Sequence, residues 1–341
     1  MKEQVISEEA LEEAMHKCMK GVTYKSSVAY FCLNSTDTIP QLHDQLANDT
    51  YKARRPKRFT IYYPKERNLV STAFRDRVFQ RSLNDNVVYP AMTKSFIYDN
   101  MACQKGKGND LARKRMKEFI QDYWRKNGTD GYVLKSDIHK YYESIPHEVA
   151  RNIFADKLEG WDLDQVMKVA NNQYPNAVGF NPGSQMIQIL GISTPNKKDH
   201  VIKEKMHIKY YMRYQDDTVC IHQSKTYLKQ VLAKEKELLS ELGLEINTKK
   251  TKIVKLTDGF EFLGFVYRLT DTGKVLMTVK PSKVKQERRH LRNMVKKAKK
   301  GDLPKHKVDE HLKGVLDYYA KGDSNKLIMR MQAFYKELWE E

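Results

Sequence analysis

The sequence has 341 residues and a mass of 40.0 kDa, and its 61 Lys and Arg exceed its 43 Asp and Glu, which gives a net charge of +18. A basic surplus of this size predicts a polyanionic partner, most simply nucleic acid. The mean hydropathy is −0.71 and no apolar run approaches the roughly 18 residues of a bilayer span, which argues against a membrane protein. The four cysteines have no CxxC spacing, so neither a disulfide framework nor a zinc knuckle is predicted. The first residues, MKEQVISEEALEEAM, do not resemble a secretory signal, so we expect a cytoplasmic protein.

The first 50 residues are predicted to form a helical segment. Ser7 followed by Glu8 and Glu9 is a favourable helix start, because the hydroxyl can cap the helix and the acids complement its dipole. This segment carries a net charge of −4, so the rest of the chain carries +22. The basic binding surface is therefore expected after residue 50.

The next stretch, YKARRPKRFTIYYPKERNLV, predicts a basic β-hairpin. Basic and β-forming residues alternate in it, and Pro56 and Pro64 punctuate the pattern. The following stretch, FRDRVFQRSLNDNVVYPAM, predicts helix.

The middle of the chain predicts a β-α-β-β-α-β order of elements, the split βαβ or ferredoxin-like unit. Strands are predicted at 131–138, 208–214 and 218–222, and a last strand is expected in LEINTKKTKIVKL from residue 244. An amphipathic helix at 225–243 ends at a glycine. In this topology the first and third strands are antiparallel neighbours.

The topology would place Asp137, at the end of the first strand, beside Asp216 and Asp217 at the tip of the hairpin. Three carboxylates this close raise one another's pKa unless a cation neutralises them. Oxygen ligands suit Mg²⁺ or Mn²⁺, and a pair of such ions promotes in-line phosphoryl transfer. The alternative is that Asp-Asp is a solvated turn and Asp137 a strand cap. The joint occurrence of the acids, in this order and in a basic chain, favours the metal site.

The Tyr-Gln-Asp-Asp sequence at 214–217 resembles the Tyr-X-Asp-Asp box of reverse transcriptases, and LKSDIHKYYESIPH resembles the strand that carries the family's first metal aspartate. The resemblance extends from about residue 20 to the end of the chain. It implies an α+β right-hand polymerase with fingers, a ferredoxin-like (split βαβ) palm and a helical thumb. The implied activity is that of an RNA-directed DNA polymerase, which makes cDNA from a template RNA.

The same resemblance implies the metal ligands and the domains. Asp137 and Asp216 would be the principal ligands of two Mg²⁺ ions, or of Mn²⁺, with Asp217 and the Ile138 carbonyl completing the set. The implied domains are an N-terminal helical segment, fingers, a palm with a helical insertion at about 143–205, and a thumb, at 1–50, 51–130, 131–270 and 271–341 respectively.

Several residues resemble the family's nucleotide-binding positions. Tyr142, five residues after Asp137, corresponds to the aromatic residue that closes against the sugar 2′ position, which favours DNA synthesis over RNA synthesis. Arg67, nine residues before Asp76 of an Arg-Asp-Arg element, and the nearby Lys65 correspond to groups that hold the triphosphate. The alternatives are a core tyrosine and a solvated run of charge.

Two further motifs belong to this set. VGFNPGSQMIQIL resembles the floor under the templating base, where Gly183 and Gln188 match the pattern and Ile187 stands at a position where Ser is expected. INTKKTKI resembles the motif whose lysine protonates the departing pyrophosphate, which would be Lys250. A solvated lysine is the alternative interpretation.

Basic residues outside these motifs are candidates for contact with nucleic acid. Lys105 and Lys107 lie in a KGKG turn that resembles a fingers block. Residues 280–300 contain ten Lys and Arg, and their apolar residues share one helical face, which predicts an amphipathic helix that resembles the thumb. The thumb candidates are Arg288, Arg289, Arg292 and Lys296.

The sequence most resembles the bacterial reverse transcriptases of diversity-generating retroelements, which are related to group II intron-like enzymes. That type copies a template RNA with errors at adenines, and it implies a primer or cDNA strand, dNTPs, a basic accessory protein and a structured non-coding RNA as partners, with no membrane. The abortive-infection type of phage-defence reverse transcriptase is the alternative within the family. Outside it, an RNA-dependent RNA polymerase and a non-catalytic RNA-binding palm protein are further hypotheses.

Overall fold

The computed structural model describes residues 2–62, 66–173 and 177–340, with the main chain alone described at positions 67 and 173. The chain divides into two compact units. The first unit comprises Met1–Gly108, Ser136–Thr218 and Gln230–Thr251, and the second comprises Asn109–Lys135, Val219–Lys229 and Lys252–Glu341.

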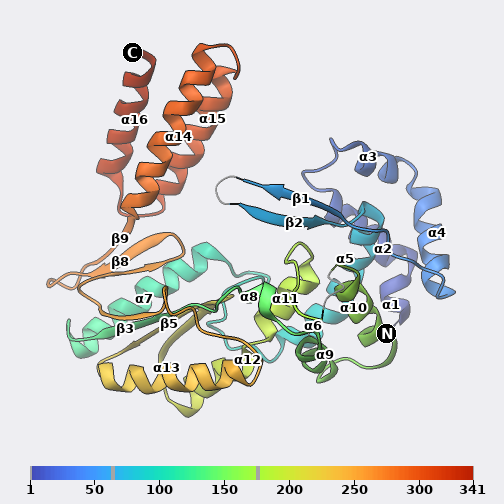
Figure 1. Ribbon diagram of the computed structural model, residues 1–341, viewed down its shortest axis with the longest axis horizontal. Helices are drawn as coiled ribbons and strands as arrows, with labels where there is room; N and C mark the ends of the chain where they lie inside the picture. The colour runs from blue at the N-terminus through green and yellow to red at the C-terminus, as the bar shows by residue number, and fades with distance from the viewer. Residues whose placement is uncertain (1, 63–65, 174–176, 341) are drawn as a thin grey trace. The chain divides into compact units, whose positions relative to one another are not determined.

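The first unit begins with the predicted helical segment, which the structure confirms (Figure 1). Its helices are α1 (Lys2–Ile6), α2 (Glu8–Met19), α3 (Ser26–Leu33) and α4 (Ser35–Ala47). Ser7 caps α2, because its hydroxyl accepts a hydrogen bond from the Ala10 N–H at 3.3 Å. The buried side chains of α2 pack against α4 and against α5 (Phe74–Leu83).

The predicted basic hairpin is also present. Strands β1 (Lys57–Ile61) and β2 (Arg67–Ser71) pair antiparallel with Lys57 opposite Ser71. The helical stretch that follows contains α5, a π-helical turn η1 (Asn84–Val88) and α6 (Tyr89–Thr93).

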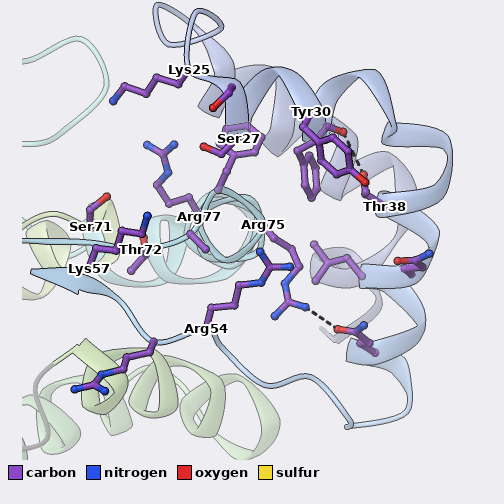
Figure 2. A pocket seen from close by; sticks show the side chains of 18 residues that line it. Lys25, Ser27, Tyr30, Thr38, Arg54, Lys57, Ser71, Thr72, Arg75 and Arg77 are labelled. Atoms are coloured by element: carbon purple, nitrogen blue, oxygen red, sulfur yellow. Dashed lines mark hydrogen bonds between the residues drawn. The ribbon is translucent and has the colours of Figure 1, made fainter.

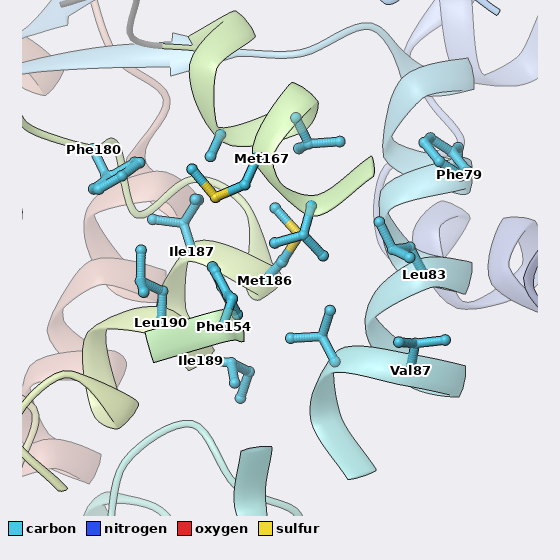
Figure 3. Packing of buried hydrophobic residues seen from close by; sticks show 14 of the residues in the cluster. Phe79, Leu83, Val87, Phe154, Met167, Phe180, Met186, Ile187, Ile189 and Leu190 are labelled. Atoms are coloured by element: carbon cyan, nitrogen blue, oxygen red, sulfur yellow. The ribbon is translucent and has the colours of Figure 1, made fainter. Parts of the chain in front are cut away.

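After the first palm strand come the helices α8 (Tyr141–Ser144), α9 (His147–Ala155), α10 (Gly160–Gln173), α11 (Gln185–Ser193), α12 (Asn196–His200) and the π-helical turn η2 (Val201–Lys205). Buried residues of α8 to α11 share the hydrophobic core of the first unit with those of α1 to α6. Figure 3 shows Phe79 and Leu83 of α5 in the same packed cluster as Phe154 of α9 and Met186 of α11. Helix α11 is therefore an interior helix, with apolar residues on most of its sides.

The palm sheet has the strand order β4-β5-β3-β6. Its first strand in the chain, β3, is therefore the neighbour of its third, β5, as predicted. Its strands are β3 (Tyr132–Ser136), β4 (Tyr210–Tyr214), β5 (Asp217–His222) and β6 (Lys252–Lys255). Helix α13 (Lys225–Ser240) connects β5 to β6 and completes the β-α-β-β-α-β order. The α+β, ferredoxin-like fold is thus confirmed.

The last strand is shorter than predicted. The chain from residue 244 makes a single bridge, between Ile246 and Ile138, before a turn in which the Thr251 N–H bonds to the Asn247 carbonyl at 2.9 Å. Regular pairing with β3 starts only at Lys252. The turn shortens the strand and places Lys250 outside it.

The second unit contains α7 (Asn109–Asn127) and an antiparallel sheet of strands β7 (Phe260–Phe262), β8 (Phe265–Leu269) and β9 (Val275–Val279). Three helices lie side by side after it (Figure 1), namely α14 (Pro281–Lys299), α15 (Lys305–Ala320) and α16 (Asn325–Glu340). The helix predicted at 280–300 is confirmed as α14, and its Leu291 and Val295 are buried. Within the described residues, no helix combines the length and the apolar character that a membrane span requires.

Candidate active site

The structure brings together the three acidic residues Asp137, Asp216 and Asp217, which we call the acid cluster. Asp137 follows β3 and is only 3% exposed, while Asp216 and Asp217 lie at the turn from β4 to β5. The pKa of the Asp216 carboxyl is raised to about 6, mainly by burial and in addition by the neighbouring charges of Asp217 and Asp137. The three carboxylates therefore lie close enough to repel one another.

The loop before β6 orients Asp137 through main-chain contacts. The Asn247 N–H donates to the Asp137 carbonyl at 2.7 Å, and the Asp137 N–H donates to the Thr251 hydroxyl at 3.2 Å. The next contact, from the His139 N–H to the Glu245 carbonyl, is 2.8 Å long. This loop replaces regular strand pairing and fixes the backbone at the first acid of the cluster.

Lys250, from the same loop, faces the acid cluster. Its ammonium lies 3.0 and 2.8 Å from the two carboxylate oxygens of Asp137. The hydrogen bond to Asp137 raises the pKa of Lys250, and the charges of Asp137, Asp216 and Asp217 add to this effect. The Lys250 side chain is nevertheless 60% exposed, so it can leave Asp137 without becoming buried elsewhere.

The donor chemistry of the acid cluster fits a divalent cation. Carboxylate oxygens are the ligands that Mg²⁺ prefers, and a cation would offset both the burial and the repulsion that raise the pKa of Asp216. Among the described residues, no group of three or more His, Cys, Asp and Glu side chains is already arranged to hold a metal ion. In this arrangement it is Lys250 that neutralises Asp137. Ile138 is buried and bridges to Ile246, and its predicted role as a ligand stays a prediction.

The tip of the hairpin has an unusual backbone conformation that a buried arginine supports. Gln215 has a φ of 55°, in the left-handed region that residues other than glycine seldom adopt. The Arg213 guanidinium donates to the Gln215 carbonyl at 3.0 Å. The Gln215 side chain also approaches the Cys103 sulfur at 3.2 Å. These contacts hold the main chain directly before the two acids.

Tyr142 lies in α8 near the acid cluster. Its ring lies 5.2 Å from that of Tyr141 and packs on Gly191, where an added Cβ would come within 2.5 Å of the Tyr142 hydroxyl. Burial raises the pKa of Tyr142, and the charge of Asp216 contributes to the shift. Its hydroxyl is buried and has no hydrogen-bond partner among the described residues. Tyr142 thus has the packing of a core residue, and its contact with a sugar stays a prediction.

The residues of the predicted template floor have different environments. Gly183 is exposed, its N–H donates to the Asn181 side chain at 2.9 Å, and a Cβ there would lie 3.1 Å from the Val70 carbonyl of β2. Gln188 turns back to donate to the Pro182 carbonyl at 2.9 Å. Ile187 is fully buried in the core, which explains an apolar residue where Ser was expected.

The predicted triphosphate-binding residues lie, in the sequence, where β1 ends and β2 begins. Lys65 lies outside the described residues, and Arg67 begins β2 with only its main chain described. Asp76, in the adjoining Arg-Asp-Arg element, is buried, and it accepts hydrogen bonds from the Tyr51 hydroxyl and the Arg54 N–H at 2.9 Å each. Asp76 therefore ties the segment before β1 to α5.

The two lysines of the KGKG turn differ in their contacts. Lys105 is exposed, with its ammonium 5.2 Å from the Tyr89 ring centre. Lys107 is partly buried, and its ammonium donates to the carbonyls of Tyr98 and Asn100 at 2.7 and 3.0 Å. Burial lowers the pKa of Lys107. Lys107 therefore supports the turn itself, whereas Lys105 is available to solvent.

In the second unit, three of the four thumb candidates line one groove of about 740 Å³ on α14. These are Arg288, Arg289 and Arg292, and the guanidinium groups of the first and third lie 5.1 and 5.4 Å from the ring centre of Phe334. Lys296 is exposed beyond the groove. The predicted basic face of this helix is thus present.

A feature of the first unit that the sequence did not predict is a basic pocket of about 780 Å³ between α3, α4, α5 and the ends of the hairpin (Figure 2). Tyr30, at its rim, is 69% exposed. No Asp or Glu occurs among the described residues that line the pocket. Its cationic residues are Lys25, Arg54, Arg55, Lys57, Arg75 and Arg77. They come from three separate segments, so no local sequence pattern marks the pocket.

Residues 63–267 match the family model described as reverse transcriptase (RNA-dependent DNA polymerase). The chain belongs to the reverse transcriptase family. The match spans the palm strands β3 to β6 and therefore includes the acid cluster and Lys250. The family resemblance read from the motifs is confirmed at this level, while the type within the family stays a prediction.

Solved structures of telomerase are also similar to this reverse transcriptase. Apo telomerase from Candida tropicalis shares 14% identity over 65% of this chain and 48% of its own, with a TM-score of 0.48. Telomerase from Candida albicans with a TWJ fragment of telomeric RNA shares 11% identity over 73% of this chain and 51% of its own, with a TM-score of 0.49. The chain thus spans about half the length of these proteins. No curated protein matches the sequence.

Proposed function

We propose that this reverse transcriptase copies a template RNA into cDNA, by attack of a primer 3′ hydroxyl on the α-phosphate of a bound dNTP. The observation that carries the proposal is the convergence of Asp137, Asp216 and Asp217 on one exposed lysine, Lys250. This arrangement combines oxygen ligands for cations with a proton donor, the two needs of nucleotidyl transfer.

Asp137 and Asp216 would be the principal ligands of two Mg²⁺ ions, or of Mn²⁺, and Asp217 and the Ile138 carbonyl would complete the set. When bound, the ions neutralise charge at the attacking and leaving oxygens. The Asn247 and Thr251 contacts orient Asp137 for this role. The remaining catalytic effect would come from positioning of primer and dNTP.

Lys250 would move between two partners during the reaction. Its ammonium first neutralises Asp137 and then donates a proton from Nζ to the departing pyrophosphate. Lys65, Arg67, Gly183 and Gln188 would hold the dNTP and the templating base, as the family resemblance implies. The Tyr142 ring would exclude a ribose 2′ hydroxyl from the nucleotide site.

Primer extension on an RNA template with dNTPs and Mg²⁺ tests the proposal. Asp216→Asn keeps the shape of the side chain and removes its charge, so extension should be lost. Asp271→Asn, in the exposed turn between β8 and β9, is the matched control and should leave extension unchanged. Undiminished synthesis by Asp216→Asn would contradict the assignment.

The same assay separates the alternative polymerase and the non-catalytic protein. Efficient use of NTPs by the unmodified chain would favour an RNA-dependent RNA polymerase. RNA binding without metal dependence and without extension on any primer would favour a palm kept only for binding.

We further propose that the basic pocket binds single-stranded template RNA. Among the described residues no carboxylate lines the pocket, although Arg75 pairs with the adjoining Asp76 at 3.3 Å. Exposed Tyr30 offers a ring on which a base can stack. In the second unit, the α14 groove with Arg288, Arg289 and Arg292, and exposed Lys296 beyond it, would bind the backbone of the nucleic acid. Exposed Lys105 of the first unit would make a separate backbone contact.

The salt dependence of RNA binding tests the pocket. Replacing Arg54, Arg55 and Lys57 by Gln should lower the slope of log affinity against log salt by about 2, since each phosphate contact to a single strand contributes about 0.7. A control with equal loss of charge replaces the exposed lysines Lys168, Lys229 and Lys236 by Gln. Equal slopes for the two triple variants would reject the pocket as an RNA site.

Within the family, we propose the diversity-generating type, with a basic accessory protein and a structured non-coding RNA as partners. The support is the resemblance of the thumb sequence HLKGVLDYYAKGDSNKL to that of diversity-generating and related bacterial enzymes. Near-identical DNA repeats beside the gene that differ at adenines would support it. A location among phage-resistance genes without such repeats would select the defence type instead.

A further inference from the structure

Two consecutive charged residues of α12, Lys198 and Asp199, are buried and form hydrogen bonds to different strands of the hairpin, Lys198 to β5 and Asp199 to β4. Lys198 is 1% exposed and Asp199 is fully buried. Charged side chains are seldom buried to this degree unless they are paired. Each of the two has a buried partner of opposite charge, Glu235 for Lys198 and Arg213 for Asp199.

Lys198 connects three elements of the first unit. Its ammonium donates to the Glu235 carboxylate of α13 at 2.6 Å and to the Thr218 hydroxyl at 2.8 Å. The Ser136 hydroxyl donates to the same Glu235 oxygen at 2.9 Å. One buried ion pair therefore joins Ser136, the last residue of β3, to Thr218 at the start of β5.

Asp199 holds the incoming strand of the hairpin. Its carboxylate accepts from the Arg213 Nε at 2.8 Å and from Nη2 at 2.6 Å, and from the Tyr211 hydroxyl at 2.5 Å. Arg213 in turn donates to the carbonyls of Ile192 and Gln215 at 2.7 and 3.0 Å. The Asp199 contact therefore reaches the strained turn residue directly before Asp216.

These contacts flank the acid cluster on both sides. Ser136 immediately precedes Asp137, and Thr218 immediately follows Asp217. Because successive side chains of a strand point to opposite faces, the Thr218 side chain lies on the face of β5 opposite that of Asp217. The polar network joins the main chain at the first acid to the main chain at the hairpin acids.

We propose that the Lys198–Glu235 and Asp199–Arg213 pairs are positioning residues that set the spacing between Asp137 and the hairpin acids, and hence the affinity of the acid cluster for divalent metal. The proposal rests on the proposed function, because it concerns the same metal ligands. Partners that orient metal ligands commonly change metal affinity or activity by 10- to 100-fold when removed.

Stability alone does not account for the Lys198–Glu235 pair. A buried ion pair can often be replaced by apolar side chains without loss of stability, because desolvation offsets the attraction. The second oxygen of Glu235, Oε2, is buried and has no hydrogen-bond partner among the described residues. An apolar core would avoid that cost, whereas only polar groups can hold both Ser136 and Thr218.

The double variant Lys198→Met/Glu235→Leu tests this inference. It leaves no unpaired buried charge, so the fold can be retained, but it removes the bonds to Ser136 and Thr218. Mn²⁺ binding to the full chain without nucleic acid, followed by the paramagnetic resonance of free Mn²⁺, should weaken by about 10- to 100-fold. Primer extension should show a matching rise in the metal concentration at half-maximal rate.

Lys197→Met is the matched control, because Lys197 lies next to Lys198 on α12 but is 71% exposed and pairs with Glu241. It should bind Mn²⁺ like the unmodified chain. Glu235→Gln keeps an acceptor for Lys198 and Ser136 but removes the counter-charge of Lys198, so it should lower the free energy of unfolding while the folded chain retains most of the Mn²⁺ affinity that the double variant loses. Thr218→Val, similar in shape, removes one bond and should weaken Mn²⁺ binding in the same direction by a smaller factor.

The outcomes separate this inference from the proposed function. If the unmodified chain binds Mn²⁺ and extends primers while the folded double variant binds Mn²⁺ equally well, the inference is wrong. If the double variant does not fold, unchanged Mn²⁺ binding by Thr218→Val would overturn it. If the unmodified chain neither binds Mn²⁺ nor extends a primer, the proposed function fails first.

Discussion

Two lysine–carboxylate pairs lie next to the palm strands β3 and β5, and their environments differ sharply. The Lys250–Asp137 pair is 2.8 Å long, and its lysine is 60% exposed. The Lys198–Glu235 pair is 2.6 Å long, and both side chains are almost completely buried. The distances are similar, so the difference between the pairs lies in solvent access.

This difference suits the pairs to different roles. An exposed pair contributes little to stability and can open, so Asp137 can exchange the Lys250 ammonium for a metal ion. A buried pair cannot lose one partner without leaving an uncompensated charge, so Lys198 and Glu235 stay together. The first pair is built to change partners during the reaction, and the second to keep the strands in place.

The largest contrast is expected when each carboxylate is neutralised without a change of shape. Asp137→Asn should slow single-nucleotide extension by about 1000-fold, comparable to the loss of a group that stabilises developing charge. In the folded chain Glu235→Gln should slow it by no more than about fivefold, because the amide oxygen still accepts from Lys198 and Ser136, while the loss of the Lys198 counter-charge lowers stability instead. Rapid-quench kinetics at saturating dNTP measure both rates. A larger effect at Glu235 than at Asp137 would reverse the roles assigned to the two pairs.

The two lysines should differ in their contribution to stability. Lys198→Met leaves Glu235 buried and unpaired, so the free energy of unfolding should fall by about 3–5 kcal/mol. Lys250→Met removes an exposed partner and should change it by less than about 1 kcal/mol. Urea unfolding followed by circular dichroism measures both variants. Equal losses would show that solvent access does not distinguish the pairs.

The smallest effect is expected on metal binding when the exposed lysine is removed. Lys250→Met deletes the cation that competes for Asp137, so Mn²⁺ affinity should rise by up to about fivefold, which corresponds to the ~1 kcal/mol that an exposed pair contributes at most. Extension should slow at the same time, since the proton donor to pyrophosphate is lost. Titration with Mn²⁺ measures the affinity, and weaker binding by this variant would argue against competition.

Much of the fold could be predicted because its signals are local. Alternating strands, the glycine after α13 and the order of elements predicted the ferredoxin-like sheet, and the sheet order brought Asp137 to the hairpin acids. The shortened last strand was missed, since the turn at Asn247 depends on its contact with the Asp137 carbonyl. That contact joins residues far apart in the sequence.

The supporting residues of the site carried no comparable signal. Lys197 and Lys198 are the same residue type at adjacent positions, yet one is 71% exposed and the other 1%. Lys107, whose contact with nucleic acid stays a prediction, donates to two main-chain carbonyls, which no local pattern indicated. In both cases the number of other elements packed around the side chain decides its role.

Residue spacing and strand alternation were therefore enough to predict which acids meet and on which kind of sheet, because both properties belong to the covalent chain and its local geometry. Which cations are buried, which face solvent, and which segments line the basic pocket was decided only in the folded molecule. The physical reason is that the free energy of a charge depends on the water excluded by distant parts of the chain, and no local pattern records that exclusion.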